Sequence, residues 1–131
     1  MRGESFQFRK CERIVSQKTI DELFSGDHSQ SLVVYPVRAV FMLRPRKAGD
    51  EAMQVLMSVP KRRLKHAVDR NRVKRQLREA WRLQHAAILS DSLSADQSLA
   101  VAFVWLQDGL SSTDTVASSM RHILQRIAKK L

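Results

Sequence analysis

A run of eight apolar residues, Leu99–Leu106 (LAVAFVWL), constrains the fold of this chain more than any other segment. It is far too short to cross a membrane, which takes about 20 residues. Because neither alternate side carries a polar residue, we expect a strand buried on both faces inside a sheet. The length of 131 residues predicts one domain, residues 1–131, and residues 1–17 are expected to form a polar, loosely packed segment.

The segments around this strand alternate between helical and strand patterns. Because Pro36 has no N–H to donate, it places the first part of its strand at a sheet edge or a bulge. Helices and strands are thus mixed, which predicts an α+β fold with helices packed on a single sheet. In chain order we expect a helix over 18–25, a strand over 32–43, a hairpin connection over 44–52, a strand over 55–59, a helix running from the basic segment into Leu89, a polar loop over 90–98 and an amphipathic helix over 113–131.

Positive charge is concentrated in about one sixth of the chain, the segment Lys61–Arg82 (KRRLKHAVDRNRVKRQLREAWR). The segment holds ten of the 23 Lys and Arg residues but only two of the 13 acidic residues, so it carries most of the net charge of +10. The candidate RNA-binding residues are these ten together with Asn71, whose amide can add directional hydrogen bonds: Lys61, Arg62, Arg63, Lys65, Arg70, Asn71, Arg72, Lys74, Arg75, Arg78 and Arg82.

Helical phase places these charges on one side of a helix, which we call the basic face. Four of the basic residues recur at intervals of four, and the apolar residues lie opposite them, toward the core. Like charges four apart destabilise a helix by about 0.2–0.5 kcal/mol per pair, and only Arg75–Glu79 relieves them. A sequence selected for stability alone would intersperse acids, so binding of a polyanion is favoured over a merely solvated face. The basic set is Arg70, Lys74, Arg78 and Arg82, and the apolar set is Val73, Leu77, Ala80 and Trp81.

The surroundings of the basic face favour RNA among the polyanions. A membrane-surface helix would expose apolar residues beside its charges, but here they are needed for the core. DNA recognition would call for a helix-turn-helix or a similar motif, and strands flank this helix instead. We therefore expect an RNA partner, and neither DNA nor a membrane.

The sequence VDRNRVKRQLREAWR resembles the signature of the protein subunit of bacterial ribonuclease P. The Arg-Asn-Arg core of that family falls at residues 70–72, its Lys-Arg pair at 74–75 and its Arg-Glu-Ala-aromatic run at 78–81. Upstream, SVPKRRLKHAV is similar to the family's Ser-Val-Ser-Lys-Lys segment, and the likeness extends over residues 9–106. The chain departs from the family pattern at Leu56, Pro60 and Lys65, and Ile20 replaces a Phe.

The resemblance implies a fold and a division of labour. The fold is α-β-β-β-α-β-α, similar to the second domain of small-subunit ribosomal protein five, with a left-handed crossover. The RNA subunit would be the catalyst of this endoribonuclease and would hold the Mg²⁺, so no catalytic or metal-binding residue is assigned to the protein. The protein would bind the catalytic RNA through the basic segment. It would hold the 5′ leader of precursor tRNA in a cleft with Ile20, Phe24 and Phe41 as candidates, unless these three are ordinary core residues.

Two other functions are compatible with the residues. One is a general module for structured RNA, ribosomal-protein-like or chaperone-like, with no processing role. The other is an independent nuclease with His66 as acid–base, although the four histidines are scattered without metal-ligand spacing. The single cysteine, Cys11, reads as a reduced thiol, and the N-terminus lacks an apolar signal region. We therefore expect a cytoplasmic protein.

Overall fold

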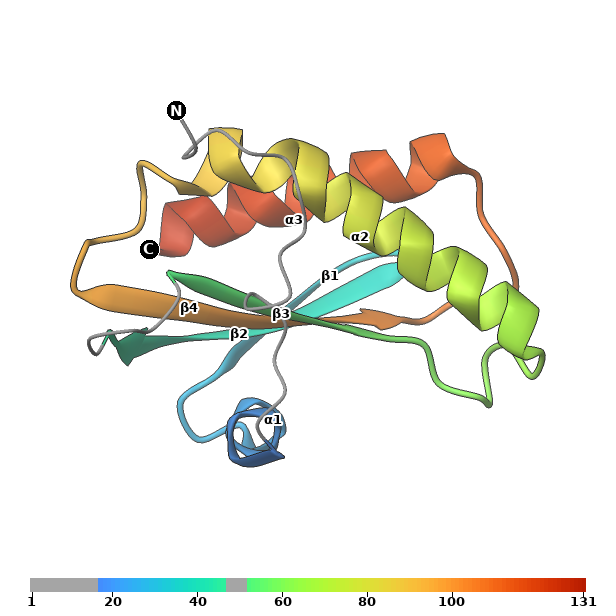
Figure 1. Ribbon diagram of the computed structural model, residues 1–131, viewed down its shortest axis with the longest axis horizontal. Coiled ribbons are helices and arrows are strands. Elements are labelled where there is room, and N and C mark those ends of the chain that lie inside the picture. The colour runs from blue at the N-terminus through green and yellow to red at the C-terminus, as the bar shows by residue number, and fades with distance from the viewer. Residues whose placement is uncertain (1–16, 47–51) are drawn as a thin grey trace.

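The computed structural model describes residues 17–46 and 52–131, which form one four-stranded sheet with helices on both faces (Figure 1). The predicted α+β class and the order α-β-β-β-α-β-α are confirmed. The elements are α1 (Gln17–Ser25), β1 (Gln30–Val34), β2 (Val37–Pro45), β3 (Met53–Ser58), α2 (Ala67–Leu89), β4 (Gln97–Trp105) and α3 (Thr113–Lys130).

The apolar segment predicted as a buried strand is β4, and it lies inside the sheet. The strand order is β1-β2-β4-β3, with β4 antiparallel to β2 and parallel to β3. Phe103 and its alternate neighbours pack under α2 and α3, whereas Ala100 and Ala102 pack toward α1. Burial on both faces is thereby confirmed. The parallel pair is joined through α2, and the left-handed sense of that crossover stays a prediction.

The two faces of the sheet are covered unequally. Helices α2 and α3 lie together on one face, and the short α1 lies on the other (Figure 1). The larger core lies under α2 and α3 and contains Trp81 and Trp105, both fully buried. The smaller core centres on Leu23 of α1. Among residues 17–46 and 52–131, therefore, no other helix covers the part of this sheet face beside α1.

Two sequence expectations about the strands are wrong. Residues 32–43 are not one strand, because Tyr35–Pro36 forms a turn between β1 and β2. Pro36 is tolerated in the turn because its position there does not require an N–H that donates to a neighbouring strand. The prediction that the first part of this segment lies at a sheet edge is confirmed, since β1 is an edge strand. Residues 44–52 do not connect a hairpin either, because β4 inserts between β2 and β3. The strand buried on both faces needs two neighbours, and β2 and β3 supply them.

The basic segment is only partly helical. Helix α2 begins at Ala67, and residues 61–63 form a turn in which the Pro60 carbonyl accepts from the N–H groups of Arg63 (3.0 Å) and Leu64 (3.4 Å). The predicted C-terminal helix is confirmed almost to the residue. It is capped by Ser112, whose hydroxyl accepts from the N–H of Thr115 at 3.1 Å.

Residues 1–16 and 47–51 lie outside the described residues, so the predictions for the N-terminal segment, including Cys11, are not addressed. Across the two described ranges, no helix is long and apolar enough to span a bilayer.

Candidate nucleic-acid interface

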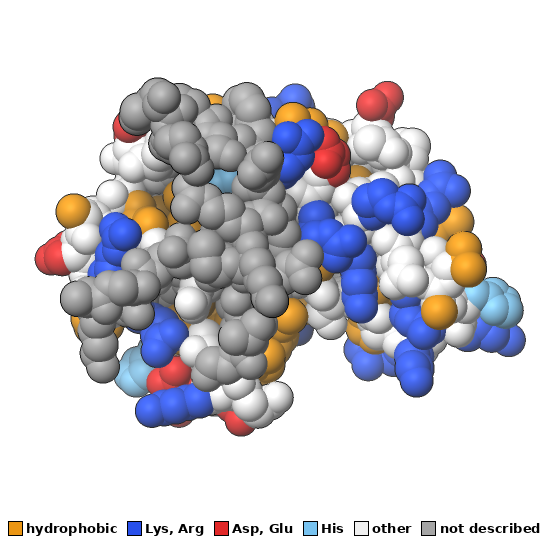
Figure 2. All heavy atoms as spheres, in the orientation of Figure 1, with side chains coloured by type: hydrophobic (Ala, Val, Ile, Leu, Met, Phe, Trp, Pro, Cys, Tyr) orange, Lys and Arg blue, Asp and Glu red, His pale blue; other side chains and the backbone are white. Residues whose placement is uncertain are grey.

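The basic face is observed on α2 and on the turn before it. Figure 2 shows Lys and Arg side chains gathered over this part of the molecule. The apolar residues predicted to oppose them, including Val73 and Leu77, are fully buried in the larger core. The exposed members of the candidate set are Lys61, Arg62, Lys65, Asn71, Arg72 and Arg75, and the half-buried members are Arg63, Arg70, Lys74, Arg78 and Arg82.

Arg70 has a structural contact that helical spacing did not predict. Its Nη1 donates to the carbonyl oxygens of Leu64 (2.9 Å) and Lys65 (2.8 Å). These carbonyls belong to the loop between the 61–63 turn and the start of α2. Arg70 therefore fixes the loop that carries Lys65 relative to the helix, in addition to any contact with RNA.

Two other basic residues are paired with acids. Arg63 bonds the carboxylate of Asp108 at 3.0 Å, and Arg82 makes a two-point contact with Glu79. The expected Arg75–Glu79 pair is thus replaced by Arg82–Glu79, at a spacing of three residues. The hydrogen bond from Arg82 lowers the pKa of the Glu79 carboxyl, and the same bond raises the pKa of Arg82. The pair stays charged through the physiological range.

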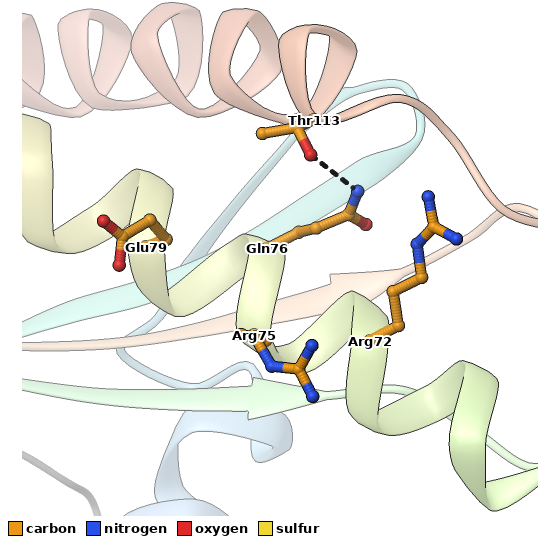
Figure 3. Close-up of a pocket in the computed structure, with 5 residues that line it drawn as sticks. All are labelled: Arg72, Arg75, Gln76, Glu79 and Thr113. Carbon is orange, nitrogen blue, oxygen red and sulfur yellow. Dashed lines mark hydrogen bonds between the residues drawn. The ribbon is translucent and has the colours of Figure 1, made fainter.

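Arg72 and Arg75 are exposed and lie at a groove of about 310 Å³ between α2 and the start of α3. Neither makes an ion pair among the described residues. The groove also contains Gln76 and Thr113 from facing helices (Figure 3). Gln76 donates from Nε2 to Thr113 Oγ1 and to the Ser111 carbonyl, each at 3.2 Å, which joins the two helices at the groove.

The candidate Phe41 does not lie on the side of the sheet covered by α1. Its side chain is 1% exposed and packs in the larger core, under α2 and α3. The cleft assignment of Phe41 is therefore wrong, and its role is core packing. The residues of β2 that do face α1 are Val40 and Met42, in the smaller core.

The two candidates on α1 remain next to the sheet. Ile20 is half-buried against the smaller core, and Phe24, one turn later, leaves 46% of its surface exposed. Helix α1 is tied to β2 by Arg44, which donates to Thr19 Oγ1 at 3.0 Å. An exposed phenyl ring on a helix held in this way is a surface on which a base could stack.

The two described histidines nearest the basic segment lie apart from each other. His66 is exposed at the N-cap of α2, and His85 is buried with its ring stacked on Trp81 at 4.6 Å. Within residues 17–46 and 52–131, no three His, Cys, Asp or Glu side chains come together in a way that could hold a metal ion.

The family model described as Ribonuclease P matches residues 8–128 of this chain. The chain belongs to the ribonuclease P protein family. A relative from Porphyromonas gingivalis named "Ribonuclease P protein component" is 39% identical over 126 residues, which cover 95% of this chain and 88% of the relative. A protein of the same name from Chlorobaculum tepidum is 33% identical over 81 residues, 57% of this chain and 53% of that protein.

The ribonuclease P fold is supported independently by a solved structure. The ribonuclease P protein from Thermotoga maritima superposes with a TM-score of 0.65 at 18% identity, covering 88% of this chain and 96% of that one. The suspected family and the fold class are thus confirmed, and with them the role of a ribonuclease P protein. The individual site residues stay predictions.

Sequence reasoning missed several residues of this ribonuclease P protein. The side of β2 that meets α1 could have been found from Arg38 and Arg44, which share a face with Val40 and Met42. A face with two arginines cannot be the deepest core, which puts Phe41 on the other one. Gln76 gave no signal, because its partners lie more than 30 residues away in sequence.

Proposed function

We propose that this chain is the RNA-binding subunit of ribonuclease P and holds the catalytic RNA on the basic face. The observation that carries the proposal is the one-sided distribution of charge on a helix whose other side is locked into the core. A rigid helix presents its guanidinium and ammonium groups at fixed spacing, which suits the regular phosphates of a folded RNA. Membership of the ribonuclease P protein family supports the catalytic RNA of ribonuclease P as this partner.

Cleavage of precursor tRNA is assigned to the RNA subunit, with Mg²⁺ held there. The acids of the basic segment, Asp69 and Glu79, do not suit a metal site, since Glu79 is already bonded to Arg82 and cations surround both. The part of the protein is to bind, orient and neutralise phosphates, so that the folded RNA and its substrate come together. We place this activity in the bacterial cytoplasm.

A second RNA contact is proposed on the sheet face beside α1, for the single-stranded 5′ leader. Phe24 supplies an exposed ring, and the half-buried Ile20 supplies apolar surface one turn earlier on the same helix. Single-stranded RNA is bound by stacking bases on such rings, largely without regard to sequence. This set replaces the one that contained Phe41.

Reconstitution tests the first contact. The protein should restore cleavage of precursor tRNA by its cognate RNA subunit at Mg²⁺ concentrations too low for the RNA alone. The double variant Arg72→Ala/Arg75→Ala should weaken the effect, and Lys129→Ala/Lys130→Ala, which removes the same charge at the exposed end of α3, should not. No stimulation by the wild-type protein under any salt condition would refute the proposal. Protein without RNA should not cleave.

Leader length tests the second contact. Phe24→Ala should weaken binding of a precursor with a long leader, by about 1–3 kcal/mol for one lost stack, and leave binding of a leaderless tRNA unchanged. The control is Tyr35→Ala, which removes an exposed ring from the β1–β2 turn. Equal losses with both RNAs would place Phe24 outside the leader site.

A further inference from the structure

The groove between α2 and α3 contains a buried hydrogen-bond acceptor without a donor. Gln76 is 8% exposed, and its Oε1 has no hydrogen-bond partner among the described residues. The orientation of the amide is fixed chemically. The nitrogen must lie toward the Ser111 carbonyl, because two carbonyl oxygens cannot bond each other. The oxygen is thus left to face the groove, on the side of Arg72 (Figure 3).

A donor that enters the groove can satisfy this acceptor, in competition with the guanidinium of Arg72, which lines the same groove. A buried polar atom that has lost water without gaining a partner is unfavourable, and such atoms are uncommon in folded proteins. The side chain of Arg72 lies on the open side and is exposed, so it can turn outward and admit a ligand. A phosphodiester alone cannot satisfy this acceptor, since its oxygens carry no proton to donate at neutral pH.

The charges at the groove favour an anion next to that donor. Arg72 and Arg75 both line it, one turn of helix apart. The one acid in the lining, Glu79, is engaged by Arg82, which limits its repulsion of an incoming phosphate. The groove thus combines two guanidinium groups with a buried acceptor and the hydroxyl of Thr113.

We propose that this groove binds one RNA nucleotide, with its phosphate on Arg72 and Arg75 and its ribose 2′-hydroxyl donating to Gln76 Oε1. This unit carries an anion and a donor close together in every RNA nucleotide, and DNA lacks the donor. The site therefore selects RNA over DNA without reading the base. The inference rests on the proposed function and adds the atom that recognises the sugar.

Interference mapping tests the site on the full protein and its cognate RNA subunit. The RNA is prepared as a pool with single 2′-deoxy substitutions at random positions, and bound and free fractions are compared. With the wild-type protein, deoxy substitution at the bound nucleotide should weaken binding about fivefold, the effect of one neutral hydrogen bond. With Gln76→Met, which keeps the side-chain length and removes the acceptor, interference at that nucleotide should vanish.

The matched control is Gln84→Met. Gln84 also bridges α2 to α3, donating to the Ala117 carbonyl at 3.0 Å, but it does not line the groove. Its variant should keep the full interference pattern. If the interference pattern is the same for wild type and Gln76→Met, the proposal is overturned. Stimulation of precursor tRNA cleavage is measured with the same protein and RNA. If it is observed while the interference prediction fails, the proposed function stands and only the nucleotide site is refuted.

A measurement on the wild-type protein covers the case in which Gln76→Met does not fold. The ¹³C signal of the Gln76 side-chain carbonyl should shift when RNA binds. It should stay in place when DNA of the same sequence is bound to the same saturation. Equal shifts with both nucleic acids, or none with RNA, would overturn the proposal.

Discussion

Removal of Arg72 and Arg75 should change the salt dependence of RNA binding by a calculable amount. Both side chains are exposed on α2, and neither is ion-paired within the described ranges. Each is therefore free to neutralise one phosphate and release its counterions. Each lost contact should flatten the slope of log K against log salt by about 0.7–0.9.

The magnitude follows from the slope. Between 50 and 200 mM salt, the loss of affinity due to one phosphate contact is about threefold. Over that range the affinity of the wild type should therefore fall by a factor about ninefold larger than the affinity of Arg72→Ala/Arg75→Ala falls. Filter binding or fluorescence anisotropy with the RNA subunit, at five or more salt concentrations, measures this. Arg63→Ala should flatten the slope less, because Arg63 must first give up its 3.0 Å contact with Asp108.

The matched comparison is Lys129→Ala/Lys130→Ala, which removes two exposed charges from the end of α3. It should leave the slope within error of the wild type. If this pair flattened the slope as much as the loss of Arg72 and Arg75, binding would follow net charge and not a defined face. That result would refute the proposal that the basic face is the RNA interface.

Three further changes test the contacts around the interface. Arg70→Ala should lower the free energy of unfolding by about 1 kcal/mol, since the Leu64 carbonyl loses its donor, and urea denaturation that showed no change would contradict this. Trp81→Ala should cost about 3–5 kcal/mol, because the indole is fully buried in the larger core, and a loss below 1 kcal/mol would contradict that packing. Glu79→Gln should tighten RNA binding by freeing Arg82. Because the pKa of Glu79 is lowered, its ion pair with Arg82 is lost only when the pH falls through that lowered pKa. The RNA affinities of wild type and Glu79→Gln should therefore become equal in acid. A difference in affinity that stays constant down to acid pH would contradict the pairing.

Local pattern was sufficient for much of the fold because burial here is strongly periodic. The apolar stripe of α3 predicted its bounds nearly to the residue, and the uninterrupted β4 run predicted burial on both faces. The pairing of strands was not predictable in the same way. Nothing within residues 44–52 indicates that β4, more than 40 residues later, will separate β2 from β3. Strand order depends on contacts between segments distant in sequence: β4 is apolar on both faces and forms hydrogen bonds along both edges, so it takes a central position.

The candidate interface shows the same limit at the level of side chains. Counting charges located the basic face, and helical phase identified the buried side of α2 correctly. Neither could show that Arg63 would be held by Asp108, or that Glu79 would select Arg82 in preference to Arg75. These pairings depend on side-chain geometry and, for Asp108, on a loop distant in sequence. They divide the basic residues into those free to meet phosphate and those already engaged.

Three departures from the family pattern, Leu56, Pro60 and Lys65, lie on β3 and in the loop that leads to the basic face, and the backbone explains how they are tolerated. Leu56 of β3 packs toward α1, and a short loop leads from the end of β3 to α2 and the basic face. Glycine is needed where φ is positive, but no described residue other than Gly26 has a positive φ, so Lys65 fits without strain. Pro60 keeps its carbonyl as the acceptor that closes the turn, and Arg70 holds the far end of the loop. The loop thus keeps its shape by hydrogen bonds to backbone carbonyls, which depend little on the side chains at positions 60 and 65, while Lys65 adds a charge to the basic face.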